Sequence, residues 1–191
     1  MAKDPAAVPV LETQRLRLRP FQLADAAGLH EAYGDPEAMR FWDFPALASV
    51  AETERAVRWS MKHNPYAYGV WAVAAKDGDR CLGLVNYHHR EQRNRRVEVG
   101  YILARAHWRR GIMSEAMTAL LDHCFDALQV RRVEALIHPE NVASIRLAEG
   151  LGFRCESGPM RDRLRVGDTF HDQLMYGLVG RESLIRRAGG V

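Results

Sequence analysis

The order of the predicted elements indicates a mixed α/β fold. Strand-like segments and two short helices come first, and the order β-α-β-α-β-β follows, which is typical of one sheet covered by helices. Apolar residues recur at every second position in the strands and with a period of 3.6 in the longest helix. Because 191 residues suit one domain, we expect a single domain over 1–191, with loose tails at 1–10 and 186–191.

Turn and cap signals define the elements of the first half. Arg15–Arg19 alternates arginine with leucine and ends at Pro20, as a strand does. The sequence from Ser49 to Glu52 is a capping box that begins a helix extending to about His63. The other elements expected in this half are a helix at Asp25–Tyr33 and two strands joined by a hairpin turn, Tyr68–Ala75 and Cys81–His88.

The strand predicted at Arg96–Leu103 is the most important one for the site. The two-residue period places Val97, Val99, Tyr101 and Leu103 on one face, and Glu98, Gly100 and Ile102 on the other. A broad apolar stripe then predicts a helix at Gly111–Leu128. The remaining elements are a strand at Val133–Ile137, a helix at Val142–Glu149, and strands at Gly152–Glu156 and Thr169–Val179.

Composition limits the class of protein. An apolar fraction of 47% and a charged fraction of 27% are ordinary for a globular domain, and a net charge of +3 does not imply nucleic acid. The three cysteines form no Cys-x-x-Cys pair, which argues against a disulfide framework or a zinc site. Since the chain has no apolar signal core and no run near the ~20 apolar residues that span a bilayer, we expect a cytoplasmic protein without nucleic-acid or membrane partners.

The segment Trp108–Ser114 has the features of an anion site. The first N–H groups of a helix have no internal partner, and the helix dipole adds partial positive charge there. Gly111 allows close approach to the backbone, while Arg109 and Arg110 supply full charges. An exposed basic loop before an ordinary helix start explains the same residues equally well.

A second helix start follows at Asn141. As an N-cap, Asn141 places Ser144 in the first turn of the helix. Capping alone accounts for Asn141, and Ser144 could equally be a small polar residue that faces solvent. The segment Glu149–Phe153 ends this helix with glycines and an aromatic residue.

Other groups of reactive residues give weaker signals. His88 and His89 are neighbours on a strand, so their side chains should point to opposite faces and could not bind one metal. We expect no metal site. His171 lies beside Asp172 without a nucleophile motif and is interpreted as structural or as part of an acceptor wall. The aromatic loop Phe41–Phe44 is expected to pack locally or to line the acceptor pocket.

Over roughly residues 11–180 the chain resembles the GNAT superfamily of acyl-CoA N-acetyltransferases, and within it the RimJ/RimL-type branch. The matching segments, in order, are Thr13–Phe21, Val97–Tyr101, Arg110–Ala116, Pro139–Ser144 and Glu149–Phe153. The resemblance implies a twisted, mostly antiparallel sheet that splays open between its fourth and fifth strands, with helices on both faces. It also makes a homodimer plausible.

The same resemblance implies where acetyl-CoA binds. The cofactor lies in the split, its pantetheine arm pairs with the backbone of Tyr101, Ile102 and Leu103, and Asn141 belongs to the same site. The residues implied to meet the pyrophosphate are Trp108, Arg109, Arg110, Gly111, Ile112, Met113 and Ser114. The chain departs from the family pattern Arg/Gln-x-x-Gly-x-Gly/Ala at Trp108 and Met113, which leaves backbone binding possible but puts the side-chain contributions in doubt.

The chemistry expected here is amine acylation. Glu98 is the candidate base, directly or through a water, because it faces the cleft beside Gly100, which leaves room for the acyl group. Ser144 is the candidate acid for the departing thiolate, as in RimL-type enzymes, and a backbone N–H would stabilise the oxyanion. The alternative for Glu98 is an ion pair with a neighbouring arginine.

The acceptor is not fixed by these residues. An α-amine, with a reference pKa of about 7.7–8.0, loses its proton more readily than a lysine amine at about 10.4. We therefore expect a protein N-terminal amine. A polyamine, amino acid or aminoglycoside is the alternative, and acidic residues converging on the acceptor cleft would favour polycations. A non-enzymatic alternative is a CoA-binding sensor without catalytic activity. The presence of both Glu98 and Ser144 argues against it.

Overall fold

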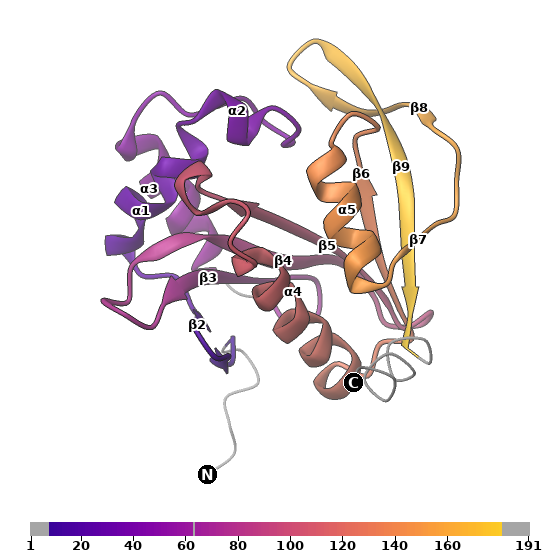
Figure 1. The fold of residues 1–191 in the computed structure, drawn as a ribbon, viewed down its shortest axis with the longest axis horizontal. Helices are drawn as coiled ribbons and strands as arrows, with labels where there is room; N and C mark the ends of the chain where they lie inside the picture. Colours follow the sequence, from indigo (N-terminus) through magenta and orange to yellow (C-terminus); the bar gives the residue numbers. More distant parts are fainter. Residues whose placement is uncertain (1–7, 63, 181–191) are drawn as a thin grey trace.

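A computed structural model describes residues 8–62 and 64–180, and these residues build one mixed sheet (Figure 1). In the described part, nine strands take the order β1-β2-β3-β4-β5-β6-β9-β7, and β8 pairs with β9. The strands are β1 (Leu11–Glu12), β2 (Leu16–Arg19), β3 (Gly69–Ala75), β4 (Cys81–Glu91), β5 (Arg96–Leu103), β6 (Arg132–Ile137), β7 (Arg154–Cys155), β8 (Met160–Val166) and β9 (Thr169–Val179). The helices are η1 (Leu23–Asp25), α1 (Ala26–Tyr33), α2 (Pro36–Met39), α3 (Val50–Ser60), η2 (Arg105–His107), α4 (Ile112–Asp122), η3 (His123–Ala127) and α5 (Val142–Leu151).

Helices cover both faces of the sheet. Figure 1 shows α1 and α3 on one side of β3 and β4, with α4 on the other side. Two hydrophobic clusters correspond to these layers: one contains Leu29 of α1 and Val57 of α3, and the other contains Met117 and Leu120 of α4. Strand β5 contributes Val97 and its face partners to the α4 cluster and Ile102 to the α1 cluster, as its two-residue period predicts.

The sheet opens between β5 and β6. These two strands are parallel, and their register extends only from Arg96↔Arg132 to Glu98↔Glu134. Every other strand pair in the described chain is antiparallel, and β9 lies between β6 and β7. Since β5 continues to Leu103 and β6 to Ile137, each strand has a segment beyond Glu98 or Glu134 that is unpaired toward the other strand, although β5 remains paired with β4 and β6 with β9. The expected split between the fourth and fifth predicted strands is confirmed.

Several expected boundaries change in the structure. Strands β1 and β8 and helix α2 have no counterpart among the predicted elements, and β4 extends to Glu91. The helix expected through Leu128 ends as α4 at Asp122 and continues as a π-helix, η3. Residues 1–10 were expected to be loose, and this is wrong for the last residues of the segment. Val8 is buried in the core, and the Pro9 carbonyl accepts a hydrogen bond of 2.7 Å from Trp71 Nε1. Residues 1–7 and 186–191 lie outside the described residues.

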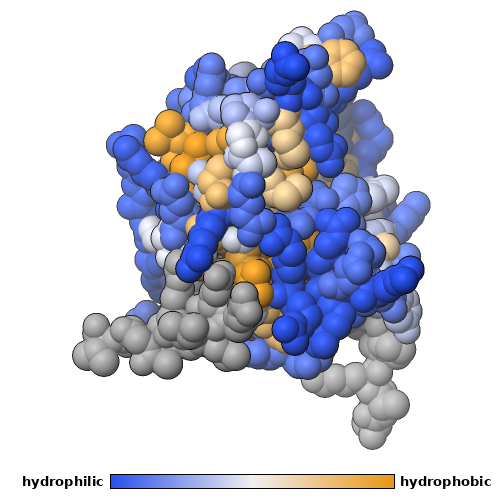
Figure 2. Space-filling model, turned by 90° about the vertical axis from the view of Figure 1, so that its right-hand side faces the viewer, coloured by the Kyte–Doolittle hydropathy of each residue, from blue (hydrophilic) through white to orange (hydrophobic). Residues whose placement is uncertain are grey.

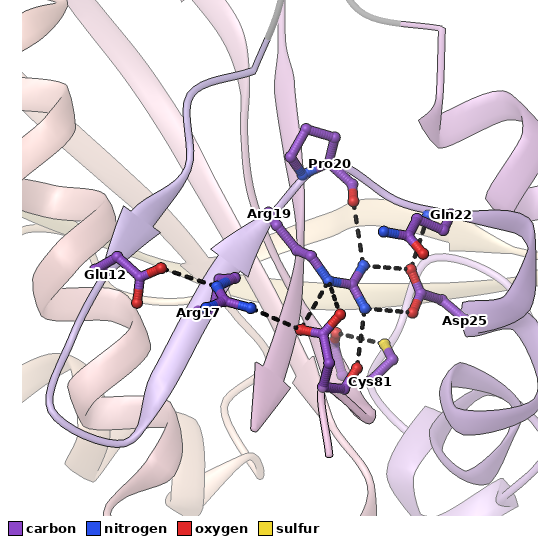
Figure 3. Close-up of polar contacts among 9 residues, drawn as sticks. Glu12, Arg17, Arg19, Pro20, Gln22, Asp25 and Cys81 are labelled. Atoms are coloured by element: carbon purple, nitrogen blue, oxygen red, sulfur yellow. Dashed lines mark hydrogen bonds and ion pairs between the residues drawn. The ribbon is translucent and has the colours of Figure 1, made fainter. Parts of the chain in front are cut away.

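A buried guanidinium joins β2 to α1 and to the β3–β4 turn (Figure 3). The Arg19 side chain is 7% exposed and donates two hydrogen bonds to Asp25, of 2.7 and 2.8 Å, and one of 3.0 Å to Asp79. The hydrogen bonds to Asp25 are the main cause that raises the pKa of Arg19. A buried charge is stable only when it is paired in this way, so this network fixes the N-terminal strand against the helical layer.

The hairpin β8–β9 extends the sheet beyond the split. Figure 2 shows this side of the molecule as mostly hydrophilic, with hydrophobic residues gathered in smaller patches. The charged residues of β8 are exposed, whereas Leu164 and Val166 are half-buried. None of the described helices combines the length and the apolar character that crossing a bilayer requires.

Candidate active site

A cavity of about 130 Å³ lies where β5 and β6 part. Its walls come from the unpaired segments of both strands, from the start of α5 and from the aromatic loop. They are formed by Ala38, Phe41, Trp42, Val99, Gly100, Tyr101, Ile102, Ala135, Leu136, Ile137, His138, Asn141 and Ser144. Asn141, a predicted cofactor-binding residue, and Ser144, the predicted acid, lie at the start of α5. They share this cavity with the strand that is predicted to pair with the pantetheine arm.

The first turn of α5 presents Ser144 to Tyr101. Asn141 is the N-cap, and its Oδ1 accepts a hydrogen bond of 3.1 Å from the backbone N–H of Ser144. The Ser144 hydroxyl lies 2.6 Å from the Tyr101 hydroxyl, and either oxygen can donate. Burial raises the pKa of Tyr101, although the hydrogen bond with Ser144 acts in the opposite direction. Tyr101 therefore carries its proton at neutral pH, and its hydroxyl forms a hydrogen-bonded pair with that of Ser144.

This pair is a feature that sequence reasoning missed. Tyr101 was expected to contribute its backbone to the site, but its side chain crosses the gap to reach α5. The only signal available was the position of Tyr101 on a strand beside a predicted cleft. The distance between a strand residue and a helix residue 43 positions apart depends on the tertiary fold and has no local signature.

The turn before α4 has the backbone geometry of an anion site. Gly111 is the N-cap with φ of 72°, in the left-handed region that favours glycine. Arg109 also has a positive φ, of 59°, and Arg109, Arg110 and Gly111 are all exposed. Met113 is buried in the core, so its side chain is unavailable to a ligand, and only its backbone N–H belongs to the helix start.

Two side chains around this turn already have partners. Trp108 Nε1 donates a hydrogen bond of 2.8 Å to the Leu103 carbonyl, which ties the turn to the end of β5. Arg15 donates to the Arg110 carbonyl at 2.9 Å and pairs with Glu115 at 2.6 Å. Trp108 is thus a structural link in this arrangement, and the departure from the family pattern at this position has a physical role.

Glu98 lies between two imidazoles on the other side of β5. Its side chain is 13% exposed, with Oε2 at 3.6 Å from His88 Nε2 and Oε1 at 3.2 Å from His89 Nδ1. The interaction with His88 is the main cause that lowers the pKa of Glu98 to about 2; burial opposes it and His89 adds to it. Glu98 is therefore a carboxylate at neutral pH.

The expectation that His88 and His89 point to opposite faces is wrong. The pairing of β4 with β5 shifts register between His88 and Glu91, and His89 has φ of 48°. This local irregularity breaks the two-residue alternation, so that the two rings lie 4.8 Å apart and both reach Glu98.

The arginines near the split have a different partner. Arg96 and Arg132 each contact the buried Glu134 at 2.6 Å, and Arg132 also pairs with Glu156 at 2.5 Å. The alternative in which Glu98 simply neutralises a neighbouring arginine is not the arrangement found. These arginines secure the last paired positions of β5 and β6 and leave Glu98 to the histidines.

A second cavity, of about 270 Å³, adjoins the first. The aromatic loop, α2, β8 and β9 enclose it, and Phe41, Trp42 and His138 belong to both cavities. His171 lines it 5.6 Å from His138, ring to ring, and Trp42 Nε1 is buried without a hydrogen-bond partner among the described residues. Tyr33 packs against Trp42 and Phe44 at ring distances of 6.2 and 5.2 Å, so the loop both packs and forms a wall.

Comparison with known proteins decides the family. A family model described as an acetyltransferase (GNAT) domain matches residues 15–154. The chain belongs to the GNAT family. It is an acetyl-CoA-dependent N-acetyltransferase, and the prediction of an enzyme of this class is confirmed.

Relatives support the same assignment. The chain is 32% identical to the uncharacterized N-acetyltransferase p20 of Bacillus licheniformis, over 90% of this chain and 97% of that protein. It is 25% identical to the ribosomal-protein-serine acetyltransferase of Escherichia coli, over 70% and 73% of the two chains. A structure of RimL, a ribosomal L7/L12 α-N-protein acetyltransferase in complex with coenzyme A, superposes with a TM-score of 0.77 at 22% identity, covering 90% and 98% of the chains. The RimL match shows that the two share a fold.

Proposed function

We propose that this GNAT enzyme acetylates a protein N-terminal α-amine, with Glu98 as the group that accepts the proton of the amine and Ser144 as the acid. The observation that carries the proposal is the placement of these two residues around one gap. Glu98 is the last residue of β5 that pairs with β6, and Ser144 lines the cavity that opens just beyond it. An attacking amine and a leaving thiolate require groups of these two kinds on either side of the reacting carbon.

The proton taken from the amine has a route away from the reaction. Glu98 is charged and only partly buried, so it attracts an ammonium group and accepts its hydrogen bond, directly or through a water. His88 Nε2, 3.6 Å from Glu98 Oε2, lies next along this route. Gly100, which lines the gap next to this position, leaves space for the acetyl group.

The proton given to the leaving group comes from the other side. In the bound state acetyl-CoA supplies a thioester, whose thiolate is a better leaving group when it is protonated. Ser144 is suited to donate that proton, because the Tyr101 hydroxyl, 2.6 Å away, can replace it. Backbone N–H groups of β5 beyond Glu98 that point toward the gap, where the pairing with β6 has ended, are the candidates that stabilise the oxyanion.

The backbone at the start of α4 is the proposed binding site for the diphosphate. The N–H groups of Ile112, Met113 and Ser114 belong to the first helical turn. Arg109 and Arg110 are exposed beside them and supply charge. The backbone from Tyr101 to Leu103, on the edge that β6 no longer covers, is the proposed partner of the pantetheine arm, except that the Leu103 carbonyl already accepts from Trp108.

The cavity beside the gap favours a peptide over a polycation. Among the described residues that line it there is no carboxylate, and its arginine, Arg40, pairs with Glu140 at 3.2 Å. The several positive charges of a polyamine or aminoglycoside would find no carboxylate partner in this wall. The E. coli relative, named as a ribosomal-protein-serine acetyltransferase, is consistent with a peptide acceptor.

The test is acetyl-CoA turnover against N-terminal peptides, polyamines and aminoglycosides, with product masses that locate the new acetyl group. We expect acetylation at the α-amine of peptides, and a much slower reaction with a peptide whose terminus is blocked but whose lysine is free. Preferred acetylation of polyamines or aminoglycosides would overturn the acceptor assignment. Turnover by Glu98→Gln at the wild-type rate would overturn the assignment of the base.

A further inference from the structure

His88, His89 and Glu98 bring three metal-binding groups together. One ligand atom from each lies within 4.8 Å of the other two, which is the one such group of three among residues 8–62 and 64–180. The Glu98 oxygens are 3.6 Å from His88 Nε2 and 3.2 Å from His89 Nδ1. Ligands of a tetrahedral zinc ion, at bond lengths of about 2.0–2.2 Å, lie roughly 3.4 Å apart. The present spacing therefore needs little change to surround such an ion.

The backbone holds the two imidazoles on one side of the sheet. His89 has φ of 48°, a conformation that is uncommon for residues other than glycine. It follows the last regular pair, His88↔Glu98, at the point where the register of β4 and β5 shifts. Without this irregularity the His89 side chain would point away from Glu98.

A hydrogen bond orients the ring of His88. Its Nδ1 lies 3.0 Å from Asn86 Oδ1. Its other ring nitrogen, Nε2, faces Glu98 Oε2 at 3.6 Å. A second partner that fixes the ring in this way is usual for histidines that bind metals.

We propose that His88 Nε2, His89 Nδ1 and a carboxylate oxygen of Glu98 form a binding site for Zn²⁺. Two imidazoles and one carboxylate suit zinc and leave the fourth position of a tetrahedron for water. The site is accessible, because the side chains of His88 and His89 are 38% and 73% exposed. Asp43, close enough to His88 for their charges to interact, adds negative charge nearby.

Zinc binding would control the acetyltransferase, a consequence that rests on the proposed function. Glu98 cannot accept the proton of the amine while its oxygen is bound to the metal, and His88 is occupied as well. The metal-bound enzyme is therefore inhibited, and removal of zinc restores turnover.

The binding experiment titrates Zn²⁺ into the metal-free full chain by calorimetry. We expect one ion per chain for the wild type and an affinity more than tenfold weaker for His89→Asn, since asparagine tolerates a positive φ but lacks the imidazole. His171→Asn, which changes a histidine of β9 outside this cluster, should keep the wild-type affinity. Substitution with Co²⁺ should give the absorption bands of a tetrahedral site in the wild type and not in His89→Asn.

The metal site would be overturned if the wild type bound no zinc at one ion per chain. It would also be overturned if His89→Asn bound zinc as tightly as the wild type. These results do not depend on turnover, so they decide the site even if no tested amine is acetylated. In the activity experiment, zinc should inhibit the wild type and leave His89→Asn at its zinc-free rate. Tight binding at the cluster without inhibition would overturn the regulatory consequence and also count against Glu98 as the base.

Discussion

The two sides of the gap between β5 and β6 are built in different ways. On one side, Asn141 caps α5 by accepting a hydrogen bond from the backbone N–H of Ser144, which is close to it in sequence. This cap orients Ser144 toward Tyr101. On the other side, Glu98 faces His88 across a regular pair of β4 and β5, and His89 joins them only because β4 then loses its regular alternation. A helix cap is encoded in local sequence, whereas a strand irregularity depends on the pairing with a neighbouring strand. This explains why the Asn141 cap was predicted correctly and the orientation of His89 was not.

Replacement of the carboxylate gives the largest expected effect. Glu98→Gln keeps the shape of the side chain but removes the charge that attracts the ammonium and accepts its proton, so we expect kcat to fall roughly 100-fold. Steady-state kinetics with a peptide acceptor measure it, and CoA affinity by calorimetry should be unchanged. Glu91→Gln, which alters a half-exposed carboxylate of β4 paired with Arg96, is the matched control.

Removal of the Ser144 hydroxyl, on the opposite side of the gap, should lower kcat less than Glu98→Gln does. Ser144→Ala deletes the proposed acid, and we expect kcat to fall roughly tenfold or more, with Tyr101→Phe producing a smaller decrease because it removes only the proton relay. The cap should survive in Ser144→Ala, since Asn141 accepts from the backbone N–H. If Ser144→Ala lowered the melting temperature and left kcat unchanged, Ser144 would belong to the cap alone.

The sequence predicts the fold better than it predicts the site. The pattern of Arg96–Leu103 places Val97, Val99 and Leu103 on one face of β5 and Ile102 on the other, because the first face carries an unbroken apolar row. The short strand β1 and the polar strand β8 were missed, because neither has an apolar period of its own. The Tyr101–Ser144 contact and the histidines around Glu98 arise from tertiary packing, which no local pattern encodes.

The cap itself gives a smaller, purely structural effect. Asn141→Ala removes the acceptor for the Ser144 N–H and should lower the free energy of unfolding by about 1 kcal/mol. Urea denaturation measures this change. Because Ser144 loses part of its orientation, we also expect a modest fall in kcat, smaller than that of Ser144→Ala. A larger loss of activity than in Ser144→Ala would assign Asn141 a direct role in catalysis or cofactor binding.

The smallest effect is spectroscopic and concerns Tyr101. Burial raises the pKa of Tyr101, so its hydroxyl should stay neutral above pH 10, where an ordinary tyrosine ionises. In an alkaline absorbance titration, Tyr101→Phe should remove a late-ionising component. Tyr66→Phe, which alters an exposed tyrosine, should leave that component in place. Ionisation of Tyr101 near neutral pH would remove the argument that it holds a proton with which to resupply Ser144.

A crystal structure of the enzyme with bound coenzyme A tests the central claim most directly. The account predicts that the diphosphate contacts the backbone at the start of α4, that the pantetheine arm lies along the unpaired part of β5, and that the thiol comes within hydrogen-bonding distance of the Ser144 hydroxyl. A thiol directed away from Ser144, or a cofactor bound outside the gap between β5 and β6, would contradict it.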